Sequence, residues 1–543
     1  MTDFQYLLKK TEYLHHFGNL FRLVTNKNLI LVLGAGVSMD AGVIGWDTLL
    51  NNIFEQSRSD HLSESIYHDL RDNCTDNLVL GQLLYNEFKR KMLKDLLDPY
   101  RDDDLIESKW KDIIKKCLYQ DRPSIEEKIK SDNFILKSFA PLIKKIKITI
   151  NYNFDDVVET LLRSEEGVEN PSRMNFEILF GNVPQSRPTG GIFHVNGFIP
   201  YDDRDISSEK IVLTENQFDK YQQEAHMTNR IKYYYQNNVC LFLGTSFRDP
   251  VLKENLIASK KANPGHFHYA IIKSDSPQSK ETFQNYLFAD LNVIPLVLSK
   301  EEIMDLGRLL SLSPEEGESY VDWSGSKRVF YLVGPAGGGK TTMREAFDTV
   351  YGISEWLNLI HPKMLDEPQK LTESESREVD HFVLTQTKKK AAEIRKMKYG
   401  IILVDRSPID AAAFATRYET DYERVKRFRE EYEKDTTTLD EVVPGCLIFL
   451  TADPKELLIR IARKRFVDTN DPKAKLIEIE KKGPINEKIY QNISTEGVFK
   501  IDSTKKTKAS VANEIAEIIF RRDYNPINVI DYLRKLEKNL KTN

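Results

Sequence analysis

The chain has 543 residues but only four cysteines, Cys74, Cys117, Cys240 and Cys446. No two of them are close enough in sequence for a Cys-x-x-Cys zinc half-site or a dense disulfide framework. We therefore expect buried thiols in a reducing compartment, and no zinc.

Long apolar runs are also missing. The longest have about five residues, as at 29–33 and 401–404, whereas a membrane span needs roughly 20. The first 16 residues mix charged and apolar side chains and lack the basic end and apolar block of a secretory signal. The sequence predicts a cytoplasmic protein that does not bind a membrane.

The chain also lacks a large excess of charge of either sign. Lys and Arg number 78 and Asp and Glu 83, which gives a formal net charge of −5 at pH 7. Because no global positive field is present, nucleic acid is not an expected partner. The 40% of hydrophobic residues is enough for folded cores, and the length predicts two or more domains.

Apolar, strand-like segments alternate with helical ones along the chain, which is typical of parallel sheets covered by helices. The segments lie at 29–33, 146–150 and 239–243, and then at 328–333, 401–404, 446–450 and 498–501. Between the two series, residues 311–326 are rich in Ser, Gly, Glu and Pro, as in a linker. We predict an α/β protein with a first parallel-sheet domain with helical insertions at 1–310, a linker at 311–326, a second parallel-sheet domain at 327–525 and a C-terminal helix at 526–543.

Polar loops follow the three strands of the first half. Since parallel strands end at the same edge of a sheet, these loops are expected to form one pocket. Glycines in the first loop let the backbone approach a pyrophosphate closely. The residues are Gly34, Ala35, Gly36 and Ser38 after the first strand, Asn151, Asn153 and Asp155 after the second, Gly244, Thr245, Ser246 and Asp249 after the third, and His194 in an apolar segment between the second and third.

In their order along the chain, these motifs resemble those of the sirtuin-like NADases of bacterial antiphage defence, over about residues 10–305. The resemblance implies a Rossmann-like fold, NAD as the substrate, and arrest or death of the infected cell through loss of NAD. It also implies regulation through homo-oligomers and a phage-derived trigger, either a nucleotide or a protein. Deacetylating sirtuins carry a four-cysteine zinc module that is missing here, so protein deacylation is the weaker alternative.

The resemblance assigns catalysis to Asn153, Asp155 and His194. Loss of nicotinamide from the ribose passes through a cationic transition state, which an ionised Asp155 would favour. Asn153 can orient a water or a ribose hydroxyl, because an amide both donates and accepts. His194 has the ordinary pKa of a general base near neutrality, about 6.5. Two points stay open: Asn151 competes with Asn153 as the catalytic amide, and another group competes with His194 as the base.

A second constellation follows the segment 328–333. Residues 334–342 fit the Gly-x4-Gly-Lys-Thr pattern, in which backbone N–H groups cradle phosphates and the lysine reaches the β and γ oxygens. Thr341 and Asp405 are the expected Mg²⁺ ligands, through a bound nucleotide. The predicted nucleotide-binding residues are Gly334, Gly337, Gly339, Lys340, Thr341, Thr342, Asp405, Arg406, Arg460 and Arg463.

This second set resembles the P-loop nucleoside and nucleotide kinases, over about residues 326–522. The resemblance implies ATP or another nucleoside triphosphate with Mg²⁺, an acceptor site at Asp405 and Arg406, and a lid at Arg460 and Arg463. We expect an NAD glycohydrolase controlled by a kinase-like nucleotide-binding domain. The alternative is a small-molecule kinase whose first domain senses NAD or ADP-ribose.

Overall fold

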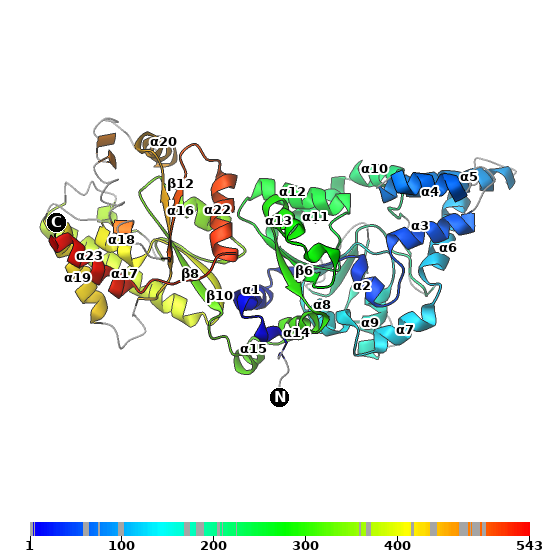
Figure 1. The fold of residues 1–543 in the computed structure, drawn as a ribbon, viewed down its shortest axis with the longest axis horizontal. Helices are drawn as coiled ribbons and strands as arrows, with labels where there is room; N and C mark the ends of the chain where they lie inside the picture. The colour runs from blue at the N-terminus through cyan, green and yellow to red at the C-terminus, as the bar shows by residue number, and fades with distance from the viewer. Residues whose placement is uncertain are drawn as a thin grey trace. The chain divides into compact units, whose positions relative to one another are not determined.

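The computed structural model describes residues 4, 6–57, 64–73, 76–95, 103–167, 174–180, 189–202, 207–208, 210–223, 225–357, 360–364, 371–413, 418–434, 442–465, 476–477, 479–480, 489–490 and 496–542. They form two compact units (Figure 1). Unit 1 comprises Met1–Lys10, Leu23–Ala262 and His268–Val321, and unit 2 comprises Thr11–Arg22, Asn263–Phe267 and Asp322–Asn543. Each unit contains one sheet, and every strand pairing in both is parallel. The predicted α/β class with two parallel sheets is confirmed.

The sheet of unit 1 has the order β3-β4-β2-β1-β5-β6-β7, so β1 is its central strand. Two of the strands predicted in the first half have the expected bounds, and the third starts two residues late because Ile146 still caps the preceding helix. The strands are β1 (Leu29–Leu33), β2 (Ile148–Asn151), β3 (Glu177–Leu179), β4 (Gly191–His194), β5 (Val239–Leu243), β6 (His268–Lys273) and β7 (Val293–Leu298).

The helical insertions of unit 1 lie mainly between β1 and β2, where α3, α5 and α6 pack on one another. The helices of this unit are α2 (Ala35–Asp40), α3 (Trp46–Ser57), α4 (Glu64–Asn73), α5 (Asn77–Asp95), α6 (Asp103–Leu118), α7 (Arg122–Lys130), α8 (Ala140–Lys145), α9 (Val157–Glu166), α10 (Glu215–Gln223), α11 (Ala225–Asn237), α12 (Pro250–Ala262), α13 (Glu281–Leu291), α14 (Lys300–Ser311) and α15 (Pro314–Tyr320). All five residues of β1 are buried, and Ile30 and Val32 belong to a core that strand and helix residues of this unit share.

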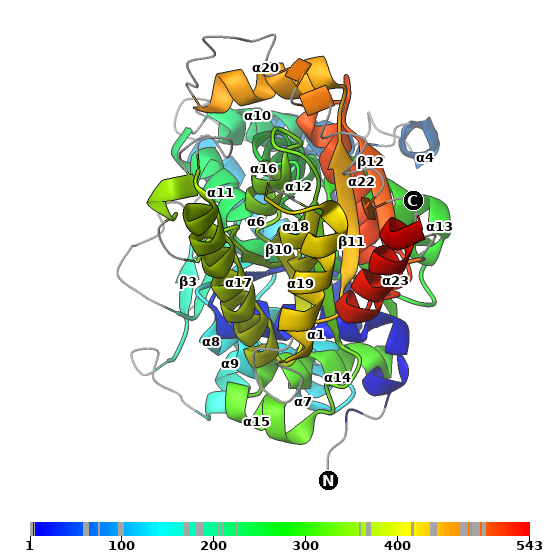
Figure 2. The same ribbon diagram turned by 90° about the vertical axis from the view of Figure 1, so that its left-hand side faces the viewer.

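The sheet of unit 2 has the order β12-β11-β8-β10-β9, with β8 in the centre. Figure 2 shows α17, α19 and α23 over one face of this sheet, and their apolar residues share a core with its strands. The strands are β8 (Lys327–Val333), β9 (Tyr351–Ile353), β10 (Gly400–Asp405), β11 (Cys446–Thr451) and β12 (Val498–Asp502). The helices are most of α1 (Leu14–Thr25), and α16 (Lys340–Ala346), α17 (Glu373–Lys396), α18 (Pro408–Ala413), α19 (Asp421–Glu433), α20 (Pro454–Arg465), α22 (Lys508–Phe520) and α23 (Val529–Thr542).

The segment 311–326 is more ordered than its composition suggests. The helix α15 begins with a capping box, in which Ser313 and Glu316 bond each other's backbone N–H groups. Trp323 is buried against Tyr399. The domain bounds taken from the sequence stay a prediction.

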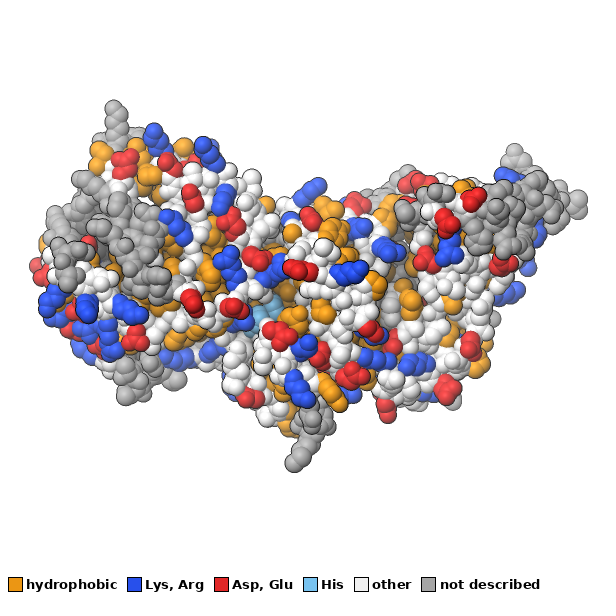
Figure 3. All heavy atoms as spheres, in the orientation of Figure 1, with side chains coloured by type: hydrophobic (Ala, Val, Ile, Leu, Met, Phe, Trp, Pro, Cys, Tyr) orange, Lys and Arg blue, Asp and Glu red, His pale blue; other side chains and the backbone are white. Residues whose placement is uncertain are grey.

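Among the described residues, no helix has the length and apolar content needed to span a bilayer. Lys and Arg side chains are interspersed with Asp and Glu over the face shown in Figure 3. Cys117, Cys240 and Cys446 are buried thiols without disulfides, and Cys74 lies outside the described residues.

Candidate functional site

The loops after β1, β2 and β5 meet at one edge of the unit 1 sheet. Leu33 is level with Asn151 of β2 on one side and with Leu243 of β5 on the other. The backbone N–H of Gly36 donates to the carbonyl of Gly244 over 2.8 Å. The polar residues that follow these three strands are therefore close neighbours, although they are more than 200 residues apart in sequence.

Glycine is required in this loop by the neighbouring backbone. A Cβ atom on Gly34 would lie 2.7 Å from the carbonyl oxygen of Gly244, and one on Gly36 would lie 2.9 Å from the Cα of Gly244. Gly244 itself has a φ of +69°. The glycines that suggested a pyrophosphate loop thus also serve to pack two loops backbone against backbone.

A chain of hydrogen bonds links three of the predicted site residues. The amide nitrogen of Asn153 donates to Ser38 Oγ over 3.0 Å, and the Ser38 hydroxyl donates to Asp155 Oδ1 over 2.9 Å. Asn153 Nδ2 also donates to the carbonyl of Gly34 over 3.0 Å, which fixes the amide orientation because a carbonyl can only accept. All three side chains are buried. Burial raises the pKa of Asp155 to about 6, against the opposing effect of the Ser38 hydrogen bond.

The two candidate amides differ in their surroundings. Asn151 is fully buried, and its Oδ1 accepts the backbone N–H of Asn153 over 3.1 Å. Asn153 is 7% exposed, and its Oδ1 accepts no hydrogen bond from any described residue. Asn153 therefore has an acceptor left for a substrate, whereas Asn151 holds the turn.

His194 ends β4, level with Asn151. Its Nδ1 lies 2.9 Å from the carbonyl oxygen of Asn153, and its Nε2 lies 2.8 Å from Glu159 Oε1 of α9. Both side chains of this ion pair are completely buried. Burial alone would lower the pKa of His194, but the Glu159 carboxylate raises it above the ordinary value. The sequence reasoning missed Glu159; the available signal was a single acid among the apolar residues that begin α9.

The loop after β5 is less tightly tied to the others. Thr245 is half-buried and Ser246 is exposed. Asp249 caps α12 by accepting the N–H of Leu252, and its other oxygen lies 3.4 Å from the amide of Asn196. Burial raises the pKa of Asp249.

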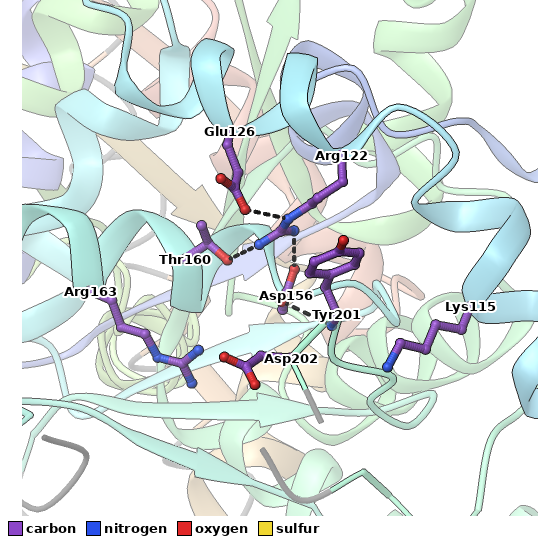
Figure 4. A pocket seen from close by; sticks show the side chains of 8 residues that line it. All are labelled: Lys115, Arg122, Glu126, Asp156, Thr160, Arg163, Tyr201 and Asp202. Atoms are coloured by element: carbon purple, nitrogen blue, oxygen red, sulfur yellow. Dashed lines mark hydrogen bonds and ion pairs between the residues drawn. The ribbon is translucent and has the colours of Figure 1, made fainter. Parts of the chain in front are cut away.

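A polar pocket of about 800 Å³ lies beside the Asn153–Asp156 loop, between α6, α7, α9 and the chain after β4 (Figure 4). At its wall, the Arg122 guanidinium pairs with Asp156 over 2.7 Å and lies over the Tyr201 ring, 4.6 Å from its centroid. Asp156 Oδ2 also accepts the backbone N–H of Tyr201 over 3.1 Å. This ion pair therefore holds the loop that carries Asn153. Cationic and anionic side chains balance around the pocket: Lys115, Arg122 and Arg163 against Glu126, Asp156 and Asp202.

The P-loop of unit 2 follows the central strand β8. Gly334, Gly337 and Gly339 have φ values of +128°, +80° and +97°. The buried Lys340 ammonium is turned back on its own loop and donates to the carbonyls of Gly334 and Pro335, each over 2.9 Å. Burial lowers the pKa of Lys340 to about 8. Thr342 follows in the first turn of α16.

The predicted magnesium ligands lie side by side. The Thr341 hydroxyl donates to Asp405 Oδ2 over 2.7 Å, and Asp405 Oδ1 is buried without a hydrogen-bond partner. An unsatisfied carboxylate oxygen beside a hydroxyl suits a hard cation that takes oxygen ligands. No group of three or more His, Cys, Asp or Glu side chains suited to a metal ion occurs within the described ranges.

The sequence analysis did not identify Glu355, which pairs with Arg406 at the predicted acceptor site. Arg406 has a φ of +68°, an uncommon backbone state for a side chain of its size. Its Nε donates to Glu355 Oε1 over 2.5 Å. Burial would raise the pKa of Glu355, but Arg406 and Lys340 lower it. Glu355 follows β9, whose three residues were too few to recognise as a strand.

The two predicted lid arginines differ. Arg460 donates to the hydroxyl and the carbonyl of Ser503, which follows β12, over 2.8 and 2.9 Å. Arg463 is exposed on the same helix.

A family model described as "SIR2-like domain" matches residues 147–296, which hold β2 to β6 and most of β7 but not the Gly34–Ser38 loop. The match supports an NAD-related activity. No curated protein matches the chain.

The solved structures that resemble part of the chain include the following three. Thymidylate kinase from Candida albicans has a TM-score of 0.29 at 16% identity, covering 37% of this chain and 99% of its own. Deoxyadenosine kinase from M. mycoides with bound dATP has a TM-score of 0.28 at 18% identity, and the match covers 35% of this chain and 97% of the kinase. Shikimate kinase from Acinetobacter baumannii in complex with shikimate has a TM-score of 0.23 at 18% identity, and the match covers 36% of this chain and 93% of the kinase.

Proposed function

We propose that the chain is an NAD glycohydrolase, which splits NAD with water into nicotinamide and ADP-ribose and so acts as an antiphage effector in the cytoplasm. The SIR2-like match supports NAD as the substrate class. The observation that carries the proposal is the Asn153 amide, whose nitrogen is held by Gly34 and Ser38 while its oxygen stays available. The defence role follows from the sequence resemblance.

In this proposal the bond between C1′ and the pyridinium nitrogen breaks, and its electron pair leaves with nicotinamide. Asn153 Oδ1 accepts a hydrogen bond from the water that attacks C1′, and that water releases its proton to solvent. Asp155 is ionised at neutral pH, because its pKa is about 6, and its charge favours the cationic sugar. The general base stays open: for His194 to act as one, either its bond to Asn153 or its bond to Glu159 must break.

Release of nicotinamide from NAD by the purified chain tests the proposal. Asn153→Ala should lower turnover about 100-fold, as expected when one oriented polar group is lost from such a site. Asn133→Ala, at an exposed position, should retain full turnover. A wild-type chain that leaves NAD intact under every nucleotide condition would refute the proposal.

We further propose that nucleotide binding by unit 2 controls this activity. Unit 2 includes Asn263–Phe267, the five residues that join α12 to β6. Within unit 2, Asn263 Nδ2 donates to the carbonyl of Ala346, the last residue of α16, over 2.9 Å. The short helix α16 therefore connects the P-loop, where a nucleotide would bind, to the segment Asn263–Phe267, which directly follows α12.

Turnover of NAD measured with a panel of nucleoside triphosphates and deoxynucleotides tests this control. At least one nucleotide should change the rate, and Lys340→Ala should remove that change. We expect the active form to be a homo-oligomer with a phage-derived trigger; light scattering that finds a stable, active monomer would contradict the first part.

A second candidate function is a small-molecule kinase with an NAD-sensing unit 1. The Glu355–Arg406 pair favours it, because it supplies a carboxylate that can accept the proton of an acceptor hydroxyl beside Lys340. Phosphoryl transfer to a nucleoside, lost in Lys340→Ala while NAD stays intact, would select this candidate.

A further inference from the structure

The histidine of the candidate NAD site has no nitrogen free for substrate. Both ring nitrogens of His194 face acceptor oxygens, the Asn153 carbonyl at 2.9 Å and Glu159 Oε1 at 2.8 Å. A carbonyl oxygen can only accept, so Nδ1 must carry a proton. The Phe198 ring lies 4.4 Å from the imidazole, and the His194 side chain is completely buried.

The two charged side chains that act most strongly on the imidazole are both negative. Glu159 from α9 and Asp155 from the loop after β2 act on His194. An imidazolium satisfies both acceptors at once, with Nδ1–H donating to the carbonyl and Nε2–H donating to the carboxylate. Glu159 Oε2 has no partner of its own, so His194 is the one described group that pairs with this carboxylate.

We propose that Glu159 is a positioning residue of the NAD site: it keeps His194 as a buried imidazolium that clamps the Asn153 carbonyl, and His194 is therefore not the general base. The clamp holds the backbone of the residue whose side chain orients water. Its kinetic consequences depend on the proposed NAD glycohydrolase function, whereas the protonation state of His194 does not.

The protonation state is measured directly by nuclear magnetic resonance of protein with labelled histidine rings. The His194 signal is assigned by its loss in His194→Gln. In the wild type at pH 7, we expect the ring nitrogen shifts of an imidazolium. In Glu159→Gln the carboxylate charge is gone while burial remains, so the signal should move to the neutral form. A neutral His194 in the wild type would overturn the proposal, whether or not the chain cleaves NAD.

Kinetics separate positioning from base catalysis. Under the proposal, Glu159→Gln lowers kcat for nicotinamide release about 3- to 10-fold at pH 7 with KM unchanged, because a neutral donor is weaker than a charged one. If His194 were the base, the wild-type rate would rise with pH through the pKa of His194, and Glu159→Gln would move that rise to lower pH. His194→Gln, which keeps one donor, should retain about a tenth of the activity, whereas loss of a general base costs about 100- to 10,000-fold.

The matched control is Glu165→Gln, the same change at an exposed position of α9. It should leave both the His194 signal and kcat as in the wild type. Thermal unfolding of each variant identifies any that fail to fold, and in that case Glu159→Asp, which keeps the charge, replaces Glu159→Gln. The clamp then predicts an imidazolium and a reduced kcat, and a neutral ring would refute it.

Discussion

Both sheets carry a glycine-rich loop after their central strand, yet the two loops use glycine differently. After β1, Gly34 and Gly36 have ordinary φ values and need glycine because the backbone of Gly244 leaves no space for a Cβ. After β8, Gly339 has a φ of +97° with open space where a Cβ would be. The P-loop also packs on its neighbours, since a Cβ on Gly334 would lie 2.2 Å from the carbonyl oxygen of Leu450, but Gly334, Gly337 and Gly339 all have positive φ values, unlike Gly34 and Gly36. The glycine and lysine positions of the P-loop lie within nine consecutive residues and are therefore readable as one pattern, whereas the polar residues of the other site come from loops far apart in the sequence.

The largest expected effect is on the P-loop. Lys340→Ala removes the ammonium that the pattern assigns to the phosphates, and hydrogen bonds to charged groups contribute about 1.5–3 kcal/mol. We expect the affinity for ATP with Mg²⁺, measured by titration calorimetry, to fall about 100-fold. Binding of NAD should stay at the wild-type level, since the candidate NAD site lies at the other sheet. An unchanged affinity for every nucleoside triphosphate would show that the P-loop is not a nucleotide site.

The second-largest expected effect is a loss of stability from a steric clash at Gly36. In Gly36→Ala the new Cβ would lie 2.9 Å from the Gly244 backbone, so one loop must shift. Overpacking of this kind typically lowers the free energy of unfolding by about 1–3 kcal/mol. In the control Gly45→Ala, the nearest atom is the sulfur of the Met39 side chain at 3.2 Å, which can move. Urea unfolding should therefore show a clear loss for Gly36→Ala and a small one for Gly45→Ala; equal losses would argue against the packing account.

Sequence patterns located several strands because their apolar runs are continuous. They placed β1 and β5 at their observed bounds and missed β3, β7 and β9, of which β3 and β9 have only three residues. They also predicted that Ser38, Asn153 and Asp155 lie at one edge of a sheet, because parallel strands end at the same edge. Whether these residues catalyse NAD cleavage stays a prediction.

What the sequence could not reveal depends on side-chain partners from distant elements. Glu159 looks like an ordinary polar residue of a helix until β4 places His194 against it. Glu355 follows an unrecognised strand and meets Arg406 only in the folded sheet. A pattern of residue types identifies which groups are present, but burial and pairing decide which protonation states they take.

The third effect concerns backbone conformation. Gly339→Ala meets no atom within 4 Å, so its cost comes from the positive φ alone, about 1–2 kcal/mol. Gly339→Asn should cost less, because asparagine tolerates this region better than alanine. Thermal unfolding compares the two variants with wild type. A larger loss for Asn than for Ala would indicate a steric cause, as at Gly36.

The smallest effect is a pH dependence in the strand-assembled site. Burial raises the pKa of Asp155 from 3.8 to about 6, so between these values the folded chain binds a proton that the unfolded chain does not. Stability from this group therefore increases as the pH falls from 7 to 5, by about 1 kcal/mol. Asp155→Asn should remove this part of the pH dependence, so that the wild type gains about 1 kcal/mol of unfolding free energy relative to the variant between pH 7 and pH 5. If wild type and variant changed in parallel from pH 7 to pH 5, Asp155 would be ionised throughout, and the charge proposed to favour the cationic sugar would persist at the lower pH.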